Sequence, residues 1–308
     1  MTTTVVIGSC SNPDYSFPLP LALLLWRDLV GYNTRAFLVG TEEQWQALPA
    51  RSCLAALRAH GLSFVFVPEL PGYSTVAVAK HVRQHAAALV DFANLDWIMP
   101  SDADLFPIRR EYFHQHEQRA ERAVLYFANG DEFQRAETAL EGFEGDRRFP
   151  TLPMCHTTMR AREWRDVWQL RPGELRASLL ATFERCRVGV AGAVPPGETS
   201  EGWAWWMDSD QRVSTALLAA QPWFHPRGVH MIWRSKRGGP PDDRLDRARM
   251  REWPTVASSA ALADRYVDAH IPRAPHGEEG WRVLAPIFEA LLPQHAAWAR
   301  QYRRGWVY

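Results

Sequence analysis

The chain has 308 residues, of which 46% are hydrophobic and 23% are charged, and its 35 acidic residues balance its 35 basic ones. A formal net charge of zero gives no basic face at the level of the whole chain and disfavours a nucleic-acid partner. The cysteines include no Cys-x-x-Cys pair, which argues against a zinc cluster and against a disulfide scaffold. The N-terminus lacks a signal-peptide pattern, and the apolar run at 19–26 is too short to span a bilayer. We therefore expect a cytoplasmic protein with no transmembrane segment; peripheral association with a membrane is the alternative.

The first half of the chain alternates between strand and helix patterns. Strands are predicted at 3–7, 34–39, 62–67 and 95–99, and helices at 19–30, 42–60 and 76–92. Strands separated by helices indicate crossover connections, and hence an α/β fold with a mostly parallel sheet flanked by helices. Ligands bind such sheets at the carboxyl ends of the strands.

The second half is less regular. Strands are predicted at 123–127 and 151–159, and helices at 163–170, 174–186 and from 211 to 220. No internal repeat or low-complexity linker interrupts the chain, so a single domain over 1–308 is the simplest organisation. Within it we expect a nucleotide-binding half at 1–130, an acceptor-side half at 131–240 and a C-terminal helical extension at 241–308.

Two aspartates follow the fourth predicted strand within the sequence Trp-Ile-Met-Pro-Ser-Asp-Ala-Asp-Leu-Phe-Pro-Ile at 97–108. Asp102 and Asp104 point to the same side if the backbone there is extended. Carboxylates between apolar runs are costly unless something neutralises them, and a hard divalent cation that shares its shell with substrate phosphates would do so. The alternative is an ordinary turn or helix cap. The apolar frame on both sides favours a functional site.

A polar loop, Gly8-Ser9-Cys10-Ser11, follows the first predicted strand. It matches neither a Gly-x-Gly-x-x-Gly fingerprint nor a Walker sequence. The loop can still present backbone N–H groups and hydroxyls to a nucleotide, although ordinary loop chemistry explains it nearly as well. In a parallel sheet, this loop and Asp102 would share one cleft.

Lys80 and Arg83 lie three positions apart on the helix predicted before the fourth strand, so they share one helix face. That face would reach the diphosphate or the sugar of a donor. A solvated helix face is an equally good interpretation of either residue alone.

Asp208 and Asp210 follow a cluster of tryptophans, Trp203, Trp205 and Trp206. Clustered rings offer flat apolar surfaces for sugars or bases, and a carboxylate among them can have a raised pKa that suits a general base. The competing interpretation is a helix cap before Gln211.

His230 and Lys236 form a third candidate element. An imidazole nitrogen can complete the shell of a manganese-like ion, and a lysine six residues later can neutralise phosphate charge. His156 and His225 are rival candidates for the metal.

Together these features resemble those of glycosyltransferases of the GT-A (Rossmann-like) fold. The Asp-x-Asp signature of that family is matched by Asp102-Ala103-Asp104, and its nucleotide-binding start resembles 5–12. His230 and Lys236 are similar to the C-terminal His-x-x-Gly-x-x-Lys element of the glycogenin-like branch, although Trp233 replaces the glycine.

The resemblance implies an enzyme that moves a hexosyl or related sugar from a nucleotide-diphosphate donor, with a UDP-sugar favoured, to a carbohydrate or other hydroxyl acceptor. The implied cofactor is Mn²⁺ or Mg²⁺, with Asp102, Asp104 and His230 as its ligands and Asp102 also near the ribose. Lys236 and Arg83 would add positive charge beside the leaving diphosphate.

By the same resemblance, Asp210 or Asp208 would deprotonate the acceptor hydroxyl of an inverting enzyme, the route that we favour. A retaining enzyme of glycogenin-like type is the alternative, and the loop at 238–243 would close over the donor in either case.

Three other classes compete with this interpretation. An aspartate-nucleophile phosphatase places its Asp-x-Asp after the first strand, and a sugar-nucleotide nucleotidyltransferase carries a basic Gly-rich loop near its N-terminus. Neither feature is present in this sequence. A non-catalytic binding module is the third, and an intact Asp102/Asp104 pair argues against it.

Overall fold

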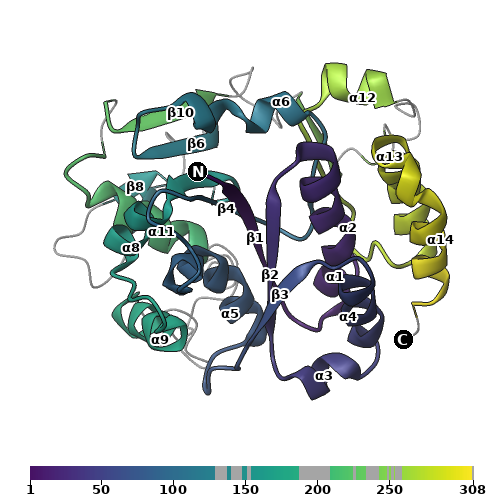
Figure 1. The fold of residues 1–308 in the computed structure, drawn as a ribbon, viewed down its shortest axis with the longest axis horizontal. Coiled ribbons are helices and arrows are strands. Elements are labelled where there is room, and N and C mark those ends of the chain that lie inside the picture. Colours follow the sequence, from purple (N-terminus) through teal and green to yellow (C-terminus); the bar gives the residue numbers. More distant parts are fainter. Residues whose placement is uncertain are drawn as a thin grey trace.

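The computed structural model describes residues 1–128, 137–139, 148–150, 154–186, 209–224, 227–233, 243–247, 250, 253 and 259–306. Its centre is a seven-stranded sheet in the order β10-β6-β9-β4-β1-β2-β3 (Figure 1). β9 is antiparallel to both of its neighbours, and the other adjacent pairs are parallel. The strands are β1 (Thr3–Ser9), β2 (Asn33–Val39), β3 (Ser63–Val67), β4 (Trp97–Ser101), β6 (Ala123–Ala128), β9 (Thr157–Arg160) and β10 (Val229–Trp233).

One face of the sheet is covered by the first helices of the chain together with the last ones, which lie side by side in Figure 1. Apolar side chains of these helices and of the sheet form one continuous buried cluster. The covering elements are α1 (Pro13–Ser16), α2 (Leu19–Leu24), the π-helical turn η1 (Leu25–Val30), α3 (Glu42–Gln46), α4 (Ala50–Ala59), α6 (Arg110–Phe113), η3 (Gln115–Gln118), α12 (Ser259–Arg265), α13 (Glu278–Leu291), η5 (Pro293–His295) and α14 (Ala296–Arg304).

The opposite face carries a second buried cluster, under helices from the middle of the chain. These are α5 (Thr75–Val82), the 3₁₀ turn η2 (Arg83–Ala88), α8 (Ala161–Trp168), α9 (Leu175–Cys186) and α11 (Ser209–Ala219). Helices on both faces explain why the inner strands β1 and β4 are buried along nearly all of their length.

A small second sheet brings the C-terminal region to the candidate aspartates. Its order is β11 (Arg244–Asp246), β12 (Asp268–His270) and β5 (Leu105–Pro107), and β5 begins directly after Asp104. β12 pairs antiparallel with β5, so His270 lies opposite Leu105. A further hairpin consists of β7 (Glu137–Ala139) and β8 (Arg148–Pro150).

The predicted α/β class with a mostly parallel, helix-flanked sheet is confirmed. The helix predicted at 42–60 is wrong in one respect: it is divided into α3 and α4, because Pro49 lacks the N–H that a helix interior needs. The boundaries proposed near 130 and 240 lie outside the described residues and stay predictions. In the described part of the chain, no helix is long and apolar enough to cross a membrane.

Candidate functional site

The carboxyl ends of β1 and β4 form one pocket. Ile7 pairs with Ser101, so the loop after β1 and the aspartates after β4 emerge side by side from the same edge of the sheet. The residues that line the pocket are Gly8, Ser9, Cys10, Tyr15, Val76, Ala79, Lys80, Arg83, Asp102, Ala103 and Asp104. The structure thus brings together most of the predicted site. Ser11 is exposed and does not line the pocket.

Gly8 is required by the close packing of α5 on β1. A Cβ atom at this position would lie 1.8 Å from the backbone oxygen of Ala79, which no side chain can relieve by moving. The glycine therefore lets α5 approach the strand, and this approach carries Lys80 and Arg83 over the strand end.

Arg83 is the central cation of the site. Its Nη1 donates to Asp102, and its Nη2 donates to Oδ2 of Asp210 at 2.6 Å. The side chains of Arg83 and Asp210 are only 4% and 3% exposed, whereas Asp102 is 34% exposed. Gln84 also donates to the backbone oxygen of Asp210. Helix α11 is therefore tied to the Asp-x-Asp segment through a buried ion pair.

Burial and charge act on the two carboxylates differently. Burial favours the protonated form of Asp102, but Arg83, the thiol of Cys155 and Lys80 outweigh it and hold the pKa of Asp102 at about 2. At Asp210, burial dominates and raises the pKa despite the guanidinium of Arg83. Asp102 is thus ionised at neutral pH and available to a cationic or hydroxylated ligand.

Cys155 and His156 adjoin the site from the segment that leads into β9. The Cys155 thiol donates to Oδ2 of Asp102, and burial raises its pKa, so the thiol is protonated at neutral pH. His156, which the sequence offered as a rival metal ligand, is fully buried and has its Nε2 3.1 Å from the hydroxyl of Ser101. It faces the core rather than the pocket.

Asp104 faces the small sheet. Its Oδ2 lies 3.1 Å from Nη1 of Arg247 and 3.4 Å from Nε2 of His270. The other ring nitrogen of His270 lies 3.4 Å from Oδ2 of Asp246. Burial lowers the pKa of His270, but hydrogen bonds to Asp104 and Asp246 outweigh this and raise it above its ordinary value. The imidazole is therefore held between two carboxylates.

The structure does not place His230 in this site. His230 is the second residue of β10, pairs with Val124 near the start of β6, and has its Nδ1 3.9 Å from Glu121. Three strand spacings separate β10 from β4, which puts His230 roughly 14 Å to the side of the Asp-x-Asp segment. His230 therefore cannot share one cation with Asp104.

Three further residues at the candidate site, His270, Arg247 and Tyr15, carry no signal in the sequence that would predict their place there. The strand that carries His270 is only three residues long, and nothing in the local pattern marks its pairing with β5. Tyr15 lies one turn beyond the predicted loop, in the short helix α1. Asp208, Lys236, His225, the tryptophans at 203, 205 and 206, and the loop at 238–241 lie outside the described residues.

The side chains present suit a divalent cation, although not as a complete site. Carboxylate oxygen and imidazole nitrogen are the donors that manganese and magnesium sites in proteins use. Within the part of the chain that the structure describes, no three His, Cys, Asp or Glu side chains converge closely enough to hold an ion. Asp104 and His270 can thus supply part of a shell, and a substrate phosphate would have to supply the rest.

No protein-family model matches the chain, and no curated protein matches it in sequence. Among solved structures, the chain is similar to the galactosyltransferase LgtC in complex with donor and acceptor sugar analogs, with 11% identity, a TM-score of 0.47, and 100% of this chain and 97% of that chain covered. It is also similar to glucosyl-3-phosphoglycerate synthase from Mycobacterium tuberculosis in complex with UDP, with 12% identity, a TM-score of 0.34, and 94% of this chain and 80% of that chain covered.

Proposed function

We propose that the protein is a metal-dependent glycosyltransferase of the GT-A fold that transfers a sugar from a UDP-sugar to a hydroxyl acceptor. The observation that carries this proposal is the convergence of Asp102, Asp104, Lys80 and Arg83 on one pocket at the carboxyl edge of a mostly parallel sheet, with His270 beside Asp104. At this edge of the sheet, the carboxylates can bind a divalent cation and the basic side chains can bind phosphate. This combination suits a nucleoside diphosphate.

Tyr15 and Lys80 would hold the nucleoside diphosphate. Tyr15 is half-buried and lines the same pocket as both aspartates, so its ring gives a base a flat surface. The pocket has a free volume of only about 40 Å³. A diphosphate therefore has to displace side chains on entry, and Arg247, at 30% exposure, can leave Asp104 for the phosphate at little cost.

A bound Mn²⁺ or Mg²⁺ would be held by Asp104 and His270, with Asp102 at the ribose side, and would supply positive charge to the departing diphosphate. Asp246 fixes the ring of His270 from behind, as carboxylates do for many metal-binding histidines. His270 takes the role that the sequence gave to His230.

Asp210 has a positioning role in this proposal rather than the role of general base. Its carboxylate is buried and ion-paired with Arg83, so it lacks the access to an acceptor hydroxyl that a base requires. It instead orients Arg83 toward Asp102 and the sugar of the donor. The inverting route that depends on Asp210 is therefore not part of the proposal.

Calorimetry with UDP and GDP, each with and without Mn²⁺, tests the function on the wild type and on Asp104→Ala. We expect the wild type to bind UDP only when the metal is present, and Asp104→Ala to lose this metal-dependent binding. Gln301→Ala, an exposed change on α14, is the matched control. UDP binding that is the same with and without Mn²⁺ and the same in the wild type and Asp104→Ala would refute the proposal. A panel of UDP-sugars, followed by release of UDP, then identifies the sugar.

A further inference from the structure

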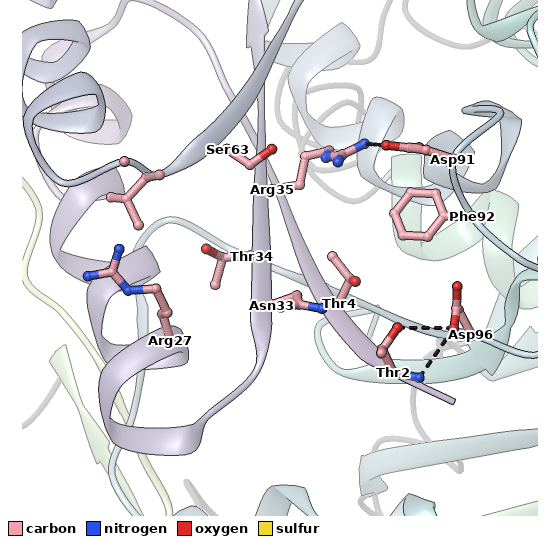
Figure 2. Close-up of a pocket in the computed structure, with 12 residues that line it drawn as sticks. Thr2, Thr4, Arg27, Asn33, Thr34, Arg35, Ser63, Asp91, Phe92 and Asp96 are labelled. Atoms are coloured by element: carbon pink, nitrogen blue, oxygen red, sulfur yellow. Dashed lines mark hydrogen bonds and ion pairs between the residues drawn. The ribbon is translucent and has the colours of Figure 1, made fainter.

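A second pocket opens at the opposite edge of the sheet, where the parallel strands begin. Its volume is about 370 Å³, within the range of roughly 300–1,000 Å³ that small-molecule sites occupy. It is formed by the amino ends of β1, β2 and β3 and by residues 91–96 before β4 (Figure 2). Thr4 in this pocket and Ser9 at the candidate active site are five residues apart on β1, so the two sites lie roughly 17 Å apart.

The strand register gathers four polar side chains on one face of this edge. Thr4 pairs with Asn33, and Arg35 pairs with Ser63. Partners in parallel strands point to the same side, and Asn33 and Arg35 are two positions apart on β2, so all four share a face. Figure 2 shows Arg35 beside Asp91 and Phe92, with Thr34 on the other side of β2.

Most of these polar groups have no partner within the described part of the chain. The side chains of Thr4, Asn33 and Ser63 make no hydrogen bond there, and the Nε of Arg35 is buried without an acceptor. A buried donor left unpaired costs about 1–3 kcal/mol. Two hydroxyls and an amide without internal partners, next to a guanidinium whose Nε has no acceptor, line one cavity and indicate a ligand rich in both hydrogen-bond donors and acceptors.

The charges of the pocket are already balanced, which argues against an anion. Arg35 is ion-paired with Asp91, and the guanidinium of Arg27 is bound to Asp28 and to the backbone oxygen of His60. Asp96 accepts three hydrogen bonds, from Thr2 and the backbone of Ala93. Among the described side chains that line the pocket, a phosphate would find no cation without a carboxylate partner, whereas a neutral polyol needs no such cation.

We propose that this pocket binds a neutral saccharide unit and is a site separate from the candidate active site. Sugar hydroxyls both donate and accept, which matches a lining of hydroxyls, an amide and paired charges. Phe92, buried with its ring centroid 5.6 Å from Cζ of Arg35, adds an apolar side chain to the lining. This assignment does not depend on sugar transfer.

Amide NMR spectra of the full chain test the site directly. Glucose and galactose stand for a free sugar, and lactose and maltotriose for a segment of a glycan; inorganic phosphate is the anionic probe. We expect at least one saccharide to shift the amides at 2–4, 33–35 and 61–63, and phosphate to leave them unchanged. If the monosaccharides shift these amides, the site accepts a free sugar. If only the oligosaccharides do, the site accepts a segment of a glycan.

Variants tie the signal to the pocket. Asn33→Ala and Ser63→Ala change exposed side chains without internal bonds, and each should weaken saccharide binding roughly three- to tenfold, the loss of one or two neutral hydrogen bonds. Gln301→Ala is the exposed-amide control, and Asp104→Ala should keep the signal even if it abolishes UDP binding. Shifts caused by phosphate alone, or by none of the probes, would overturn the proposal.

Discussion

The guanidinium of Arg83 lies between the carboxylates of Asp102 and Asp210 and bonds to both. Asp102 belongs to the loop after β4, and Asp210 to the first turn of α11, 108 positions later in the sequence (210 − 102). A single buried cation thus fixes the position of α11 relative to the candidate active site. Because Asp210 is buried, removing Arg83 would strand a negative charge in the interior.

Arg83→Met should therefore lower the free energy of unfolding by about 3–5 kcal/mol, the cost of a broken buried ion pair. Adding Asp210→Leu to Arg83→Met removes the stranded carboxylate and should recover about half of this loss, as a double-mutant cycle in urea would show. Arg300→Met breaks only a solvent-exposed pair with Glu289 and serves as the control. Equal stability of Arg83→Met and Arg300→Met would contradict the bridging role.

Alanine variants of His270 and His230 test which of the two histidines binds the metal. His270→Ala should weaken Mn²⁺-dependent UDP binding by at least about tenfold, because it removes a ligand next to Asp104. His230→Ala should leave the affinity unchanged, since His230 lies on the edge strand β10, three strand positions away from β4. Calorimetry on the two variants decides between the two histidines. Weaker binding in His230→Ala and unchanged binding in His270→Ala would instead support His230 as the metal ligand, as the sequence predicted.

The affinity for Mn²⁺ should rise with pH. Burial lowers the pKa of His270, but its bonds to Asp104 and Asp246 raise it above 6.5 overall, so the proton competes with the metal until the pH passes that pKa. The stability of the metal-free protein should change with pH in the opposite direction. The protonated imidazole contributes to the free energy of unfolding below pH 6.5, and this contribution is lost as the pH rises through the pKa of His270 in the folded protein.

A pH series of Mn²⁺ titrations checks this dependence, with His270→Gln as the reference. The wild type should gain affinity above pH 6.5, and the variant should show a flatter profile. Parallel profiles for the two proteins would show that another group controls the binding.

Tyr15→Leu should weaken UDP binding roughly three- to tenfold, because the ring that lines the pocket is lost. Tyr15→Phe keeps the ring and should bind nearly as the wild type does. If Tyr15→Phe weakens binding as much as Tyr15→Leu, the hydroxyl rather than the ring makes the contact.

Gly8→Ala should destabilise the protein by about 1–3 kcal/mol or more, because the new methyl group meets the backbone of Ala79. Gly61→Ala is a suitable control, because Gly61 has a φ of +60° that also favours glycine, but no atom of the described residues would lie within 4 Å of a Cβ atom there. Thermal unfolding of both should show the larger loss in Gly8→Ala. Gly8→Ala should also reduce UDP binding, because the methyl group displaces α5, the helix that carries Lys80.

Local patterns were enough for the core of the fold and for the placement of several candidate residues at one pocket. Alternating helix and strand periodicities predicted the parallel sheet, and the sheet predicted that the loop at Gly8 and the aspartates after β4 meet at one edge. They failed at Pro49, where a helix pattern continues through a residue that cannot donate a hydrogen bond.

The sequence by itself thus determined the α/β sheet, the edge at which chemistry is expected, and the position of Asp102 and Asp104 at that edge, because these follow from short-range periodicity and from parallel topology. Only the tertiary structure decided which partners those carboxylates have. Arg247 meets Asp104 from 143 positions away, His270 rather than His230 lies beside Asp104, and Asp210 lies behind Arg83. Such contacts depend on strand register and helix packing between distant segments, and no local pattern records them.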